Sequence, residues 1–449
     1  MKFFQFFAFL TLIGFASCQT VNENWEAESA DPDRLHRSVK QLTDVIVHDI
    51  FSPPVASRIY AYSSMAAYEA LQPGYSGYRS LGGQLNQLNA FPQPDAALEY
   101  CYPLAAVTAH TEVGKALIFS EDKIDAFTAE ITGEFKAINM PDDVFERSVA
   151  YGKEVATHVL AYADKDNYKQ SRTFPKYSLT NNPARWKPTP PDYMDGIEPH
   201  WMTIRPFVLD SAQQFKPAPP TPFNMEDKDS QFYREVMEVY TALEEDNEEK
   251  MAIAKFWDCN PFVTHHAGHV MYATKKITPG GHWINIVDIV TRQLDADIMR
   301  SAEAYAWTSI SLADAFISCW DEKYRSVVVR PETVINEFID EEWLPALQTP
   351  PFPEYTSGHS VISRSAAIAL THLFGNVAFD DTSEEEYGLP MRSFDSFMAA
   401  SDEAAMSRLY GGIHYMPACT EGVKQGEAVG RHIAATLRTR EGQISMLEE

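Results

Sequence analysis

Three short segments near the C-terminal end of the chain bring together positively charged and histidine side chains. They are KYRSVVVRP (residues 323–331), TSGH (356–359) and SRLYGGIH (407–414). The whole chain has 37 Lys and Arg against 63 Asp and Glu, a formal net charge of −26, so a gathering of cations is unexpected. Lysine and arginine bind oxyanions through charge-assisted hydrogen bonds. The pattern predicts a pocket for a small, highly charged oxyanion.

The first two segments each allow a functional and a structural interpretation. Lys323 and Arg330 are seven residues apart, about two turns of a regular helix, which would place both on one face. A solvated basic helix face is the alternative, although the intervening valines favour burial. Ser357 can cap the apolar helix that follows it, and Gly358 allows an anion to approach the positive helix end. His359 could then move protons near neutral pH.

The third segment places a cation and a histidine on either side of a glycine turn. Arg408 ends a predicted helix and can bind two oxygens at once, and His414 follows directly after Gly411 and Gly412. A single histidine in a loop is more often a packing residue. The three segments together, in this order, are hard to explain without a common site.

The three segments resemble the signature shared by vanadium-dependent haloperoxidases and type 2 phosphatidic acid phosphatases, over residues 255–440. The resemblance implies that His414 is the ligand of vanadium, or the nucleophile toward phosphorus, and that His359 is the acid or base beside the reacting oxygen. One departure is Thr356, where the family usually has proline. The resemblance also implies five residues that bind the oxygens of vanadate or phosphate: Lys323, Arg330, Ser357, Gly358 and Arg408.

Features outside the signature favour a haloperoxidase over a phosphatase. Trp320 and Phe352 resemble residues that line the substrate pocket of chloroperoxidase-like members, although both could be ordinary core aromatics. We therefore expect a vanadate cofactor, hydrogen peroxide and halide as substrates, and catalytic roles for His359, Lys323 and His414. Iodide is the favoured halide, followed by bromide. The alternatives are a secreted acid phosphatase with a phosphohistidine intermediate and an inactive surface binding protein.

Apolar residues recur at intervals of three and four along most of the chain, which predicts an all-α, multi-helix bundle with few or no strands. Residues 19–254 form an N-terminal helical half with a proline-rich crossover at 173–225, and residues 255–440 form the catalytic bundle. We expect the two to make one continuous domain. Helices are predicted over residues 35–51, 58–71, 120–138, 142–164, 228–256, 285–320, 331–344, 358–374, 393–410 and 418–438.

Two segments of the C-terminal half carry further expectations. Residues 375–392 are acidic and rich in turn-forming residues, which predicts a surface loop near the mouth of the pocket. Gly422, Gly426 and Gly430 recur every four residues in the last helix, so they should allow close packing of another helix. The same stripe could mark the seam of a homo-oligomer formed through the C-terminal helix.

The first 18 residues have the pattern of a secretory signal, in which a charged start precedes the apolar run FFQFFAFLTLIGFA. Cys18 also resembles a bacterial lipoprotein site, so the chain is expected to be exported and periplasmic, secreted or lipid-anchored. No later run is long enough to span a membrane. The acidic balance makes nucleic acid an improbable partner.

The remaining cysteines and a histidine cluster raise the question of a metal site. Widely spaced cysteines without a CxxC pair indicate neither a zinc knuckle nor a redox motif, so four buried free thiols are the simplest interpretation of Cys101, Cys259, Cys319 and Cys419. His265 and His269 have the spacing of helical zinc ligands but lack the glutamate of HExxH and an evident third ligand. In the neighbouring FWDCNPF segment, Asp258 or Asn260 is expected to orient a cation or histidine of the site.

Overall fold

The structure is a computed structural model that describes residues 21–242, 248–267 and 270–442, without the side chains of residues 265–273. The signal segment with Cys18 and the side chains of His265 and His269 therefore lie outside the described residues. The helices are α1 (Trp25–Ser29), α2 (Asp33–His48), α3 (Pro53–Leu71), α4 (Tyr102–Leu117), α5 (Glu121–Ala137), α6 (Asp142–Ala163), α7 (Tyr168–Ser171), α8 (Gln231–Ala242), α9 (Glu248–Phe256), α10 (Pro279–Gln293), α11 (Ile298–Ser326), α12 (Pro331–Phe338), α13 (Gly358–Phe374), α14 (Phe397–Tyr410) and α15 (Met416–Thr436).

Helices dominate the described chain, as the all-α prediction requires, and the extended structure is confined to two antiparallel hairpins. The strands β1 (Thr264–Ala267) and β2 (Val270–Ala273) form one hairpin, and β3 (Phe379–Asp381) pairs with β4 (Arg392–Phe394). Short 3-10 turns lie at Gln72–Gly74, Trp201–Thr203 and Glu385–Tyr387. None of the described helices is long and apolar enough to cross a membrane.

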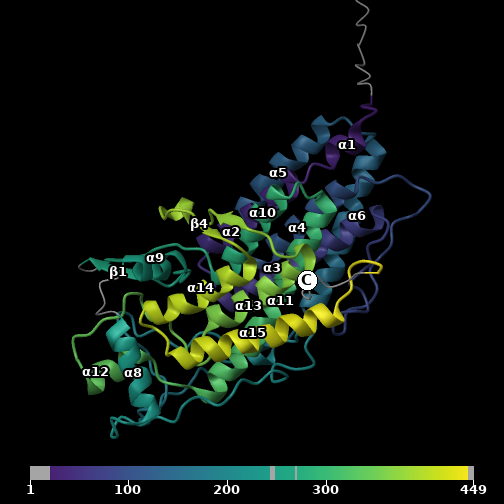
Figure 1. Ribbon diagram of the computed structural model, residues 1–449. Helices are drawn as coiled ribbons and strands as arrows, with labels where there is room; N and C mark the ends of the chain where they lie inside the picture. The colour runs from purple at the N-terminus through teal and green to yellow at the C-terminus, as the bar shows by residue number, and fades with distance from the viewer. Residues whose placement is uncertain (1–20, 243–247, 268–269, 443–449) are drawn as a thin grey trace, which may run out of the picture.

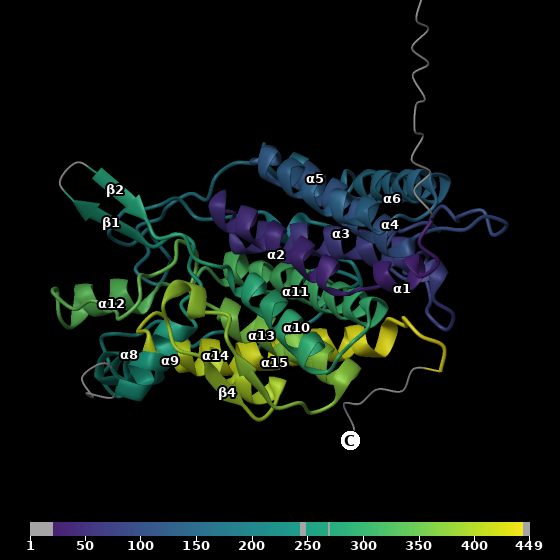
Figure 2. The same cartoon turned by 90° about the horizontal axis from the view of Figure 1, so that it is seen from above.

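The helices form layers around α11. Figure 2 shows α2 to α6 on one side of the molecule and α13 to α15 on the other, with α10 and α11 between them. Helix α11 packs against α3 on one side and against α13 on the other. Its side chains from Ser301 to Lys323 are buried throughout, so α11 is the central element to which both layers are attached (Figure 1).

Several predicted helix boundaries were wrong. The helix predicted over 285–320 is two helices, because Asp295 takes a left-handed conformation and the Asp297 side chain then caps α11 by accepting from the amide of Arg300. The helix predicted over 228–256 is likewise divided into α8 and α9. Helix α4 was missed because its residues are buried almost without interruption from Pro103 to Thr111, so it lacks the alternation that marks a half-exposed helix.

The proline-rich crossover at 173–225 is packed against the helices over much of its length. Trp186, Trp201 and Phe207 are buried, whereas Tyr193 is exposed. The buried Asp314 side chain on α11 accepts hydrogen bonds from three consecutive backbone amides of the crossover, those of residues 207–209, at 2.7, 2.8 and 3.0 Å. These bonds fasten an irregular segment to the central helix.

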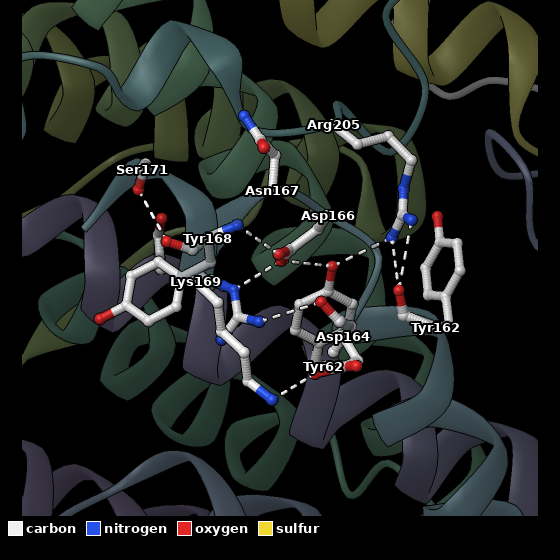
Figure 3. A network of polar contacts seen from close by, with 12 residues as sticks. Tyr62, Tyr162, Asp164, Asp166, Asn167, Tyr168, Lys169, Ser171 and Arg205 are labelled. Atoms are coloured by element: carbon white, nitrogen blue, oxygen red, sulfur yellow. Dashed lines mark hydrogen bonds and ion pairs between the residues drawn. The ribbon is translucent and has the colours of Figure 1, made fainter. Parts of the chain in front are cut away.

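A polar network at the end of α6 attaches the same crossover at Arg205 (Figure 3). The Asp166 carboxylate accepts from the Nε of Arg58 at 2.6 Å and from the hydroxyl of Tyr62 at 2.9 Å. The Arg205 side chain donates to the same hydroxyl, at 3.1 Å, and its backbone amide donates to the Asp166 carbonyl. All of these groups pair with one another, which is how a buried ion pair becomes tolerable.

The acidic segment 375–392 is not simply a surface loop. Asp381 and Glu384 are buried, at 0% and 1% exposure, and both pair with His282 of α10. The prediction failed because the acidic composition indicated solvation, whereas a histidine distant in sequence provides a buried partner for both carboxylates.

The glycine stripe of α15 faces α13. A Cβ atom at Gly426 would lie 2.1 Å from the carbonyl oxygen of Val361, and one at Gly422 would lie 2.8 Å from the Cβ of Ser360. Close helix packing is therefore confirmed as the role of the stripe. These glycines face another helix of the same chain, so their interpretation as the seam of a homo-oligomer was wrong.

Replacing one of these glycines should separate α13 from α15. Gly426→Ala should lower the free energy of unfolding by about 1–3 kcal/mol, because the added methyl group overpacks a backbone contact. The matched control is Gly133→Ala on the exposed face of α5, where a Cβ would meet no atom within 4 Å; it should be neutral or stabilising by up to about 1 kcal/mol. Urea unfolding would measure both, and equal effects of the two substitutions would contradict the proposed packing.

Candidate active site

A cavity lies where several helix ends meet. Helix ends form part of its wall, namely the last turns of α11 and α14 and the first turns of α3, α10 and α13. The rest comes from the segment after α9 (residues 258–261) and from the loops before α13 and α15. The positive end of a helix dipole, as at the start of α13, favours an anion. Six predicted site residues line this cavity: Trp320, Phe352, Gly358, His359, Arg408 and His414.

Lys323, Arg330 and Ser357 are not part of the cavity lining, but each is buried at 0% exposure close to it. The expectation that Lys323 and Arg330 share one helix face was wrong. Helix α11 ends at Ser326, Val327 takes a left-handed conformation with φ of 53°, and Arg330 is the N-cap residue of α12. The turn between the two residues brings both cations toward the same loop.

The ammonium group of Lys323 donates to three backbone carbonyls of that loop. The acceptors are the carbonyl oxygens of Pro353 at 3.0 Å, Glu354 at 3.1 Å and Thr356 at 2.5 Å. Burial lowers the pKa of Lys323 to about 8, with the neighbouring charge of Arg330 acting in the same direction. Lys323 therefore fixes the loop before Ser357 and contributes positive charge to the site.

Arg330 connects the same loop to His414. Its Nε donates to the Phe352 carbonyl at 2.9 Å, and its Nη1 donates to the Ile413 carbonyl at 2.8 Å and lies 3.1 Å from the Nε2 of His414. Its Nη2 is buried and has no hydrogen-bond partner among the described residues. An unpaired buried donor is costly, so this nitrogen is a candidate for binding an oxygen of a ligand.

The contacts of His414 determine its tautomer. Arginine can only donate, so the Nε2 that faces Arg330 must be the unprotonated nitrogen. The Nδ1 lies 2.8 Å from the Oε1 of Glu354 and donates its proton there. Burial lowers the pKa of His414 well below its usual value, and the charges of Arg330 and Lys323 add to the effect. The imidazole is thus neutral, with a lone pair on Nε2.

Glu354 is a site residue that the sequence did not reveal. Its Oε1 also accepts from the backbone amide of Tyr415 at 3.1 Å, so one carboxylate oxygen holds both the His414 ring and the start of α15. Burial raises the pKa of Glu354 to about 7, while Arg330 and Lys323 oppose the shift. The chain has 63 acidic residues, so nothing in the sequence distinguishes this glutamate beside the motif from an ordinary surface residue.

The start of α13 has the geometry that the TSGH segment predicted. The hydroxyl of Ser357 accepts from the amide of Ser360 at 3.3 Å and caps the helix. His359 forms a hydrogen bond with the backbone of Trp257, and burial together with the charge of Arg408 lowers its pKa well below the usual value. Its Nε2 is buried with no partner within the described part of the chain. His359 therefore has a neutral ring with one nitrogen available to a ligand.

Arg408 is positioned from the opposite side of the cavity. Its Nη2 donates to the Trp257 carbonyl at 2.6 Å and its Nε to the hydroxyl of Ser407 at 2.9 Å. The negative charge of Asp258 acts on Arg408, while the Asp258 carboxylate pairs with Lys276 at 2.5 Å. The expectation that Asp258 or Asn260 orients a cation or histidine of the site stays a prediction, since the contact from this segment to Arg408 comes from the Trp257 carbonyl.

Comparison with solved structures identifies the family. The chain is 51% identical to a bacterial vanadium-dependent iodoperoxidase whose crystal structure superposes with a TM-score of 0.87, over 92% of this chain and 98% of the other. This chain belongs to the vanadium-dependent haloperoxidase family. The family model described as the VCPO second helical-bundle domain matches residues 336–441.

More distant haloperoxidases share the fold. Bacterial vanadium-dependent chloroperoxidase superposes in its apo form with a TM-score of 0.64 and 17% identity, over 86% of this chain and 94% of the other. The holo form gives 0.66 and 17%, over 93% and 96%. A search of curated proteins found no match.

The residues of this haloperoxidase fit a small tetrahedral oxyanion such as vanadate. Within the part of the chain that the structure describes, the Nη2 of Arg330 and the Nε2 of His359 have no hydrogen-bond partner. Together with the Nε2 of His414 they supply one hydrogen-bond donor and two nitrogen bases. Two further cations, Lys323 and Arg408, add positive charge. A buried cluster of this kind requires a compensating anion.

The role of Glu354 can be tested in the ligand-free haloperoxidase by nitrogen-15 NMR of labelled histidine. We expect His414 to be neutral at pH 7, with its proton on Nδ1. Glu354→Gln keeps an oxygen acceptor and should retain this tautomer. Glu354→Leu removes the acceptor of the Nδ1 proton. His414 should then populate both tautomers, because Arg330 can donate to the Ile413 carbonyl alone and no longer requires an unprotonated Nε2. A proton on Nε2 of the unaltered protein, or an unchanged spectrum in Glu354→Leu, would contradict this assignment.

Proposed function

We propose that this chain uses vanadate as its cofactor and oxidises halides with hydrogen peroxide to hypohalous acid, with iodide preferred over bromide. The observation that carries the proposal is 51% identity over 92% of the chain to a bacterial vanadium-dependent iodoperoxidase. The buried arrangement of three cations and two neutral histidines supports the oxyanion cofactor, although not the choice of halide oxidation. A phosphatase remains the alternative outcome of the test, since both reactions use the same donors.

In this proposal the oxygens of vanadate are bound by Arg330, Arg408, the hydroxyl of Ser357 and the amide of Gly358, within the field of Lys323. His414 would bind the central atom through the lone pair of Nε2, in exchange for the hydrogen bond that this nitrogen accepts from Arg330. Bound vanadate supplies a Lewis acid that activates hydrogen peroxide toward halide without a change of its own oxidation state.

The proton chemistry is assigned to His359. Its Nε2 has no partner among the described residues, and its lowered pKa keeps the ring neutral at pH 7. A neutral imidazole in the cavity can accept a proton from hydrogen peroxide and return it to the departing oxygen. The three donors of Lys323 are occupied by backbone carbonyls, so Lys323 polarises the bound oxygens through its charge.

Two aromatic side chains define the approach of the halide. The rings of Trp320 and Phe352 pack 5.0 Å apart between centroids, and the Lys323 ammonium lies 5.0 Å from the centroid of Phe352. This wall excludes water from the cations, which strengthens their electrostatic effect. Iodide is a large, weakly hydrated anion, so it loses little hydration free energy when it moves to a site lined by these two rings. This supports iodide as the preferred halide.

The activity can be tested by adding orthovanadate to the purified protein. Peroxide-dependent oxidation of iodide, bromide and chloride would be measured beside hydrolysis of p-nitrophenyl phosphate. We expect iodide oxidation that depends on vanadate. His414→Ala should lose vanadate, measured by equilibrium dialysis. His359→Ala should bind vanadate with kcat reduced by about 10²–10⁴-fold.

The matched control is His158→Ala on α6, outside the cavity lining, which should keep both binding and rate. Phosphatase turnover that vanadate inhibits, without halide oxidation, would reject the haloperoxidase. Full vanadate affinity in His414→Ala would reject only the role assigned to His414 and would not reject the haloperoxidase activity.

We also propose that residues 1–18 direct export and that residues 19–254 and 255–440 form one continuous domain. The support is the apolar N-terminal run in the sequence and the burial of α11 between helices of both halves.

The mass of the protein recovered from the producing cells would test export. We expect a chain without its first residues, and with an added lipid if Cys18 is acylated. An intact N-terminus would contradict cleavage.

A further inference from the structure

A second group of buried polar side chains lies beside the cavity. The Sγ of Cys259 is 3.4 Å from the Nδ1 of His282 and 3.8 Å from the Oε1 of Glu384, and these last two atoms are 3.1 Å apart. The three residues come from the loop after α9, the first turn of α10 and the loop after β3. Each is at most 1% exposed. Among the described residues, they form a group whose ligand atoms could share one metal ion.

We propose that Cys259, His282 and Glu384 bind a zinc ion. Zinc prefers tetrahedral sites with one sulfur bond of about 2.3 Å and nitrogen or oxygen bonds of about 2.0–2.1 Å. Those bond lengths place the ligand atoms about 3.3–3.6 Å from one another. The three separations in this structure run from 3.1 to 3.8 Å, slightly below and slightly above that range.

A fourth residue orients the histidine for this role. The Nε2 of His282 lies 2.8 Å from the Oδ2 of Asp381, which would hold a proton on Nε2. The Nδ1, which faces Cys259 and Glu384, could then bind zinc once its own proton has left. Histidine ligands of metals are commonly held in this way by a carboxylate. The other oxygen of Asp381 accepts from the amide of Ser383 at 3.0 Å.

The charges of the group are also compatible with a divalent cation. Within the described chain, the ion pairs of Asp381 and Glu384 are both with His282, so a single imidazole would have to balance two buried carboxylates. Buried charges without sufficient compensation are costly. One zinc ion would balance the Cys259 thiolate and the Glu384 carboxylate beside a neutral imidazole, and the Asp381 carboxylate would keep its two hydrogen bonds.

The zinc ion would hold Trp257, which contacts two residues of the active site, in position. Trp257 stacks on the His282 ring with centroids 4.6 Å apart, and its carbonyl accepts from Arg408 at 2.6 Å. The backbone of Trp257 is also the partner of His359. The segment that ends in Cys259 thus positions a cation and a histidine of the cavity, so loss of zinc should loosen both.

The test uses the whole protein without vanadate, and its readouts do not depend on halide oxidation. Elemental analysis and native mass spectrometry of the purified protein should find about one zinc per chain. Removal of zinc with dipicolinate should lower Tm, and zinc chloride alone should restore it. Cobalt substitution should produce a thiolate-to-cobalt charge-transfer band in the near ultraviolet.

Cys259→Ser and His282→Gln should lose most of the zinc, and Cys259→Ser should lose the cobalt band. The matched control is Cys101→Ser, which replaces another fully buried cysteine, in the core between α4 and α5, and should keep both. If the variants do not fold, the cobalt band of the unaltered protein decides. A protein that takes up no zinc after chelation and titration, or shows no thiolate band, would overturn the proposal. Full zinc content in folded Cys259→Ser would do the same.

Discussion

Burial of three cations without a buried carboxylate for each is the constraint on which the active site depends. Lys323, Arg330 and Arg408 are at most 1% exposed, and their hydrogen-bond acceptors are mainly backbone carbonyls of the loops before α13 and α15 and of the segment after α9. Carbonyl dipoles lower the cost of desolvation without cancelling the positive charge. The cations therefore hold the loops in place, and the loops exclude water from the cations without removing their charge. An anion that enters meets a field that solvent has not screened.

The helices make this arrangement possible because they set the distances between the loops. Helix α13 begins at the cavity, and α15 begins beside it after His414. The glycines of α15 allow its backbone to contact α13 at Val361. The Ser357 amide also donates to the Ala418 carbonyl at 3.0 Å. A wider separation of the two helices would move His414 away from His359, so a packing feature outside the cavity controls the geometry inside it.

The sequence was most informative where function depends on neighbouring residues. The spacing of TSGH and SRLYGGIH identified the cavity residues His359, Arg408 and His414, because caps and turns are local features. Long-range partners were not predictable in this way. Glu354 and Glu384 are ordinary acidic residues in an acidic sequence until the fold places each beside a histidine. The absence of a CxxC pair likewise argued against zinc, but a site assembled from three distant segments needs no such motif.

The two histidines of the cavity experience nearly the same electrostatic field but differ in their hydrogen bonds. Burial and the charges of Lys323 and Arg408 lower the pKa of both rings, so the pKa shifts alone do not separate their roles. His414 has contacts at both nitrogens, with Glu354 and Arg330, so its proton and its orientation are fixed. Such a ring suits a ligand. The Nε2 of His359 has no partner among the described residues, and a proton can reach or leave it without breaking an existing bond. The division that we propose between vanadium ligand and proton carrier thus rests on the hydrogen-bond partners of the two rings.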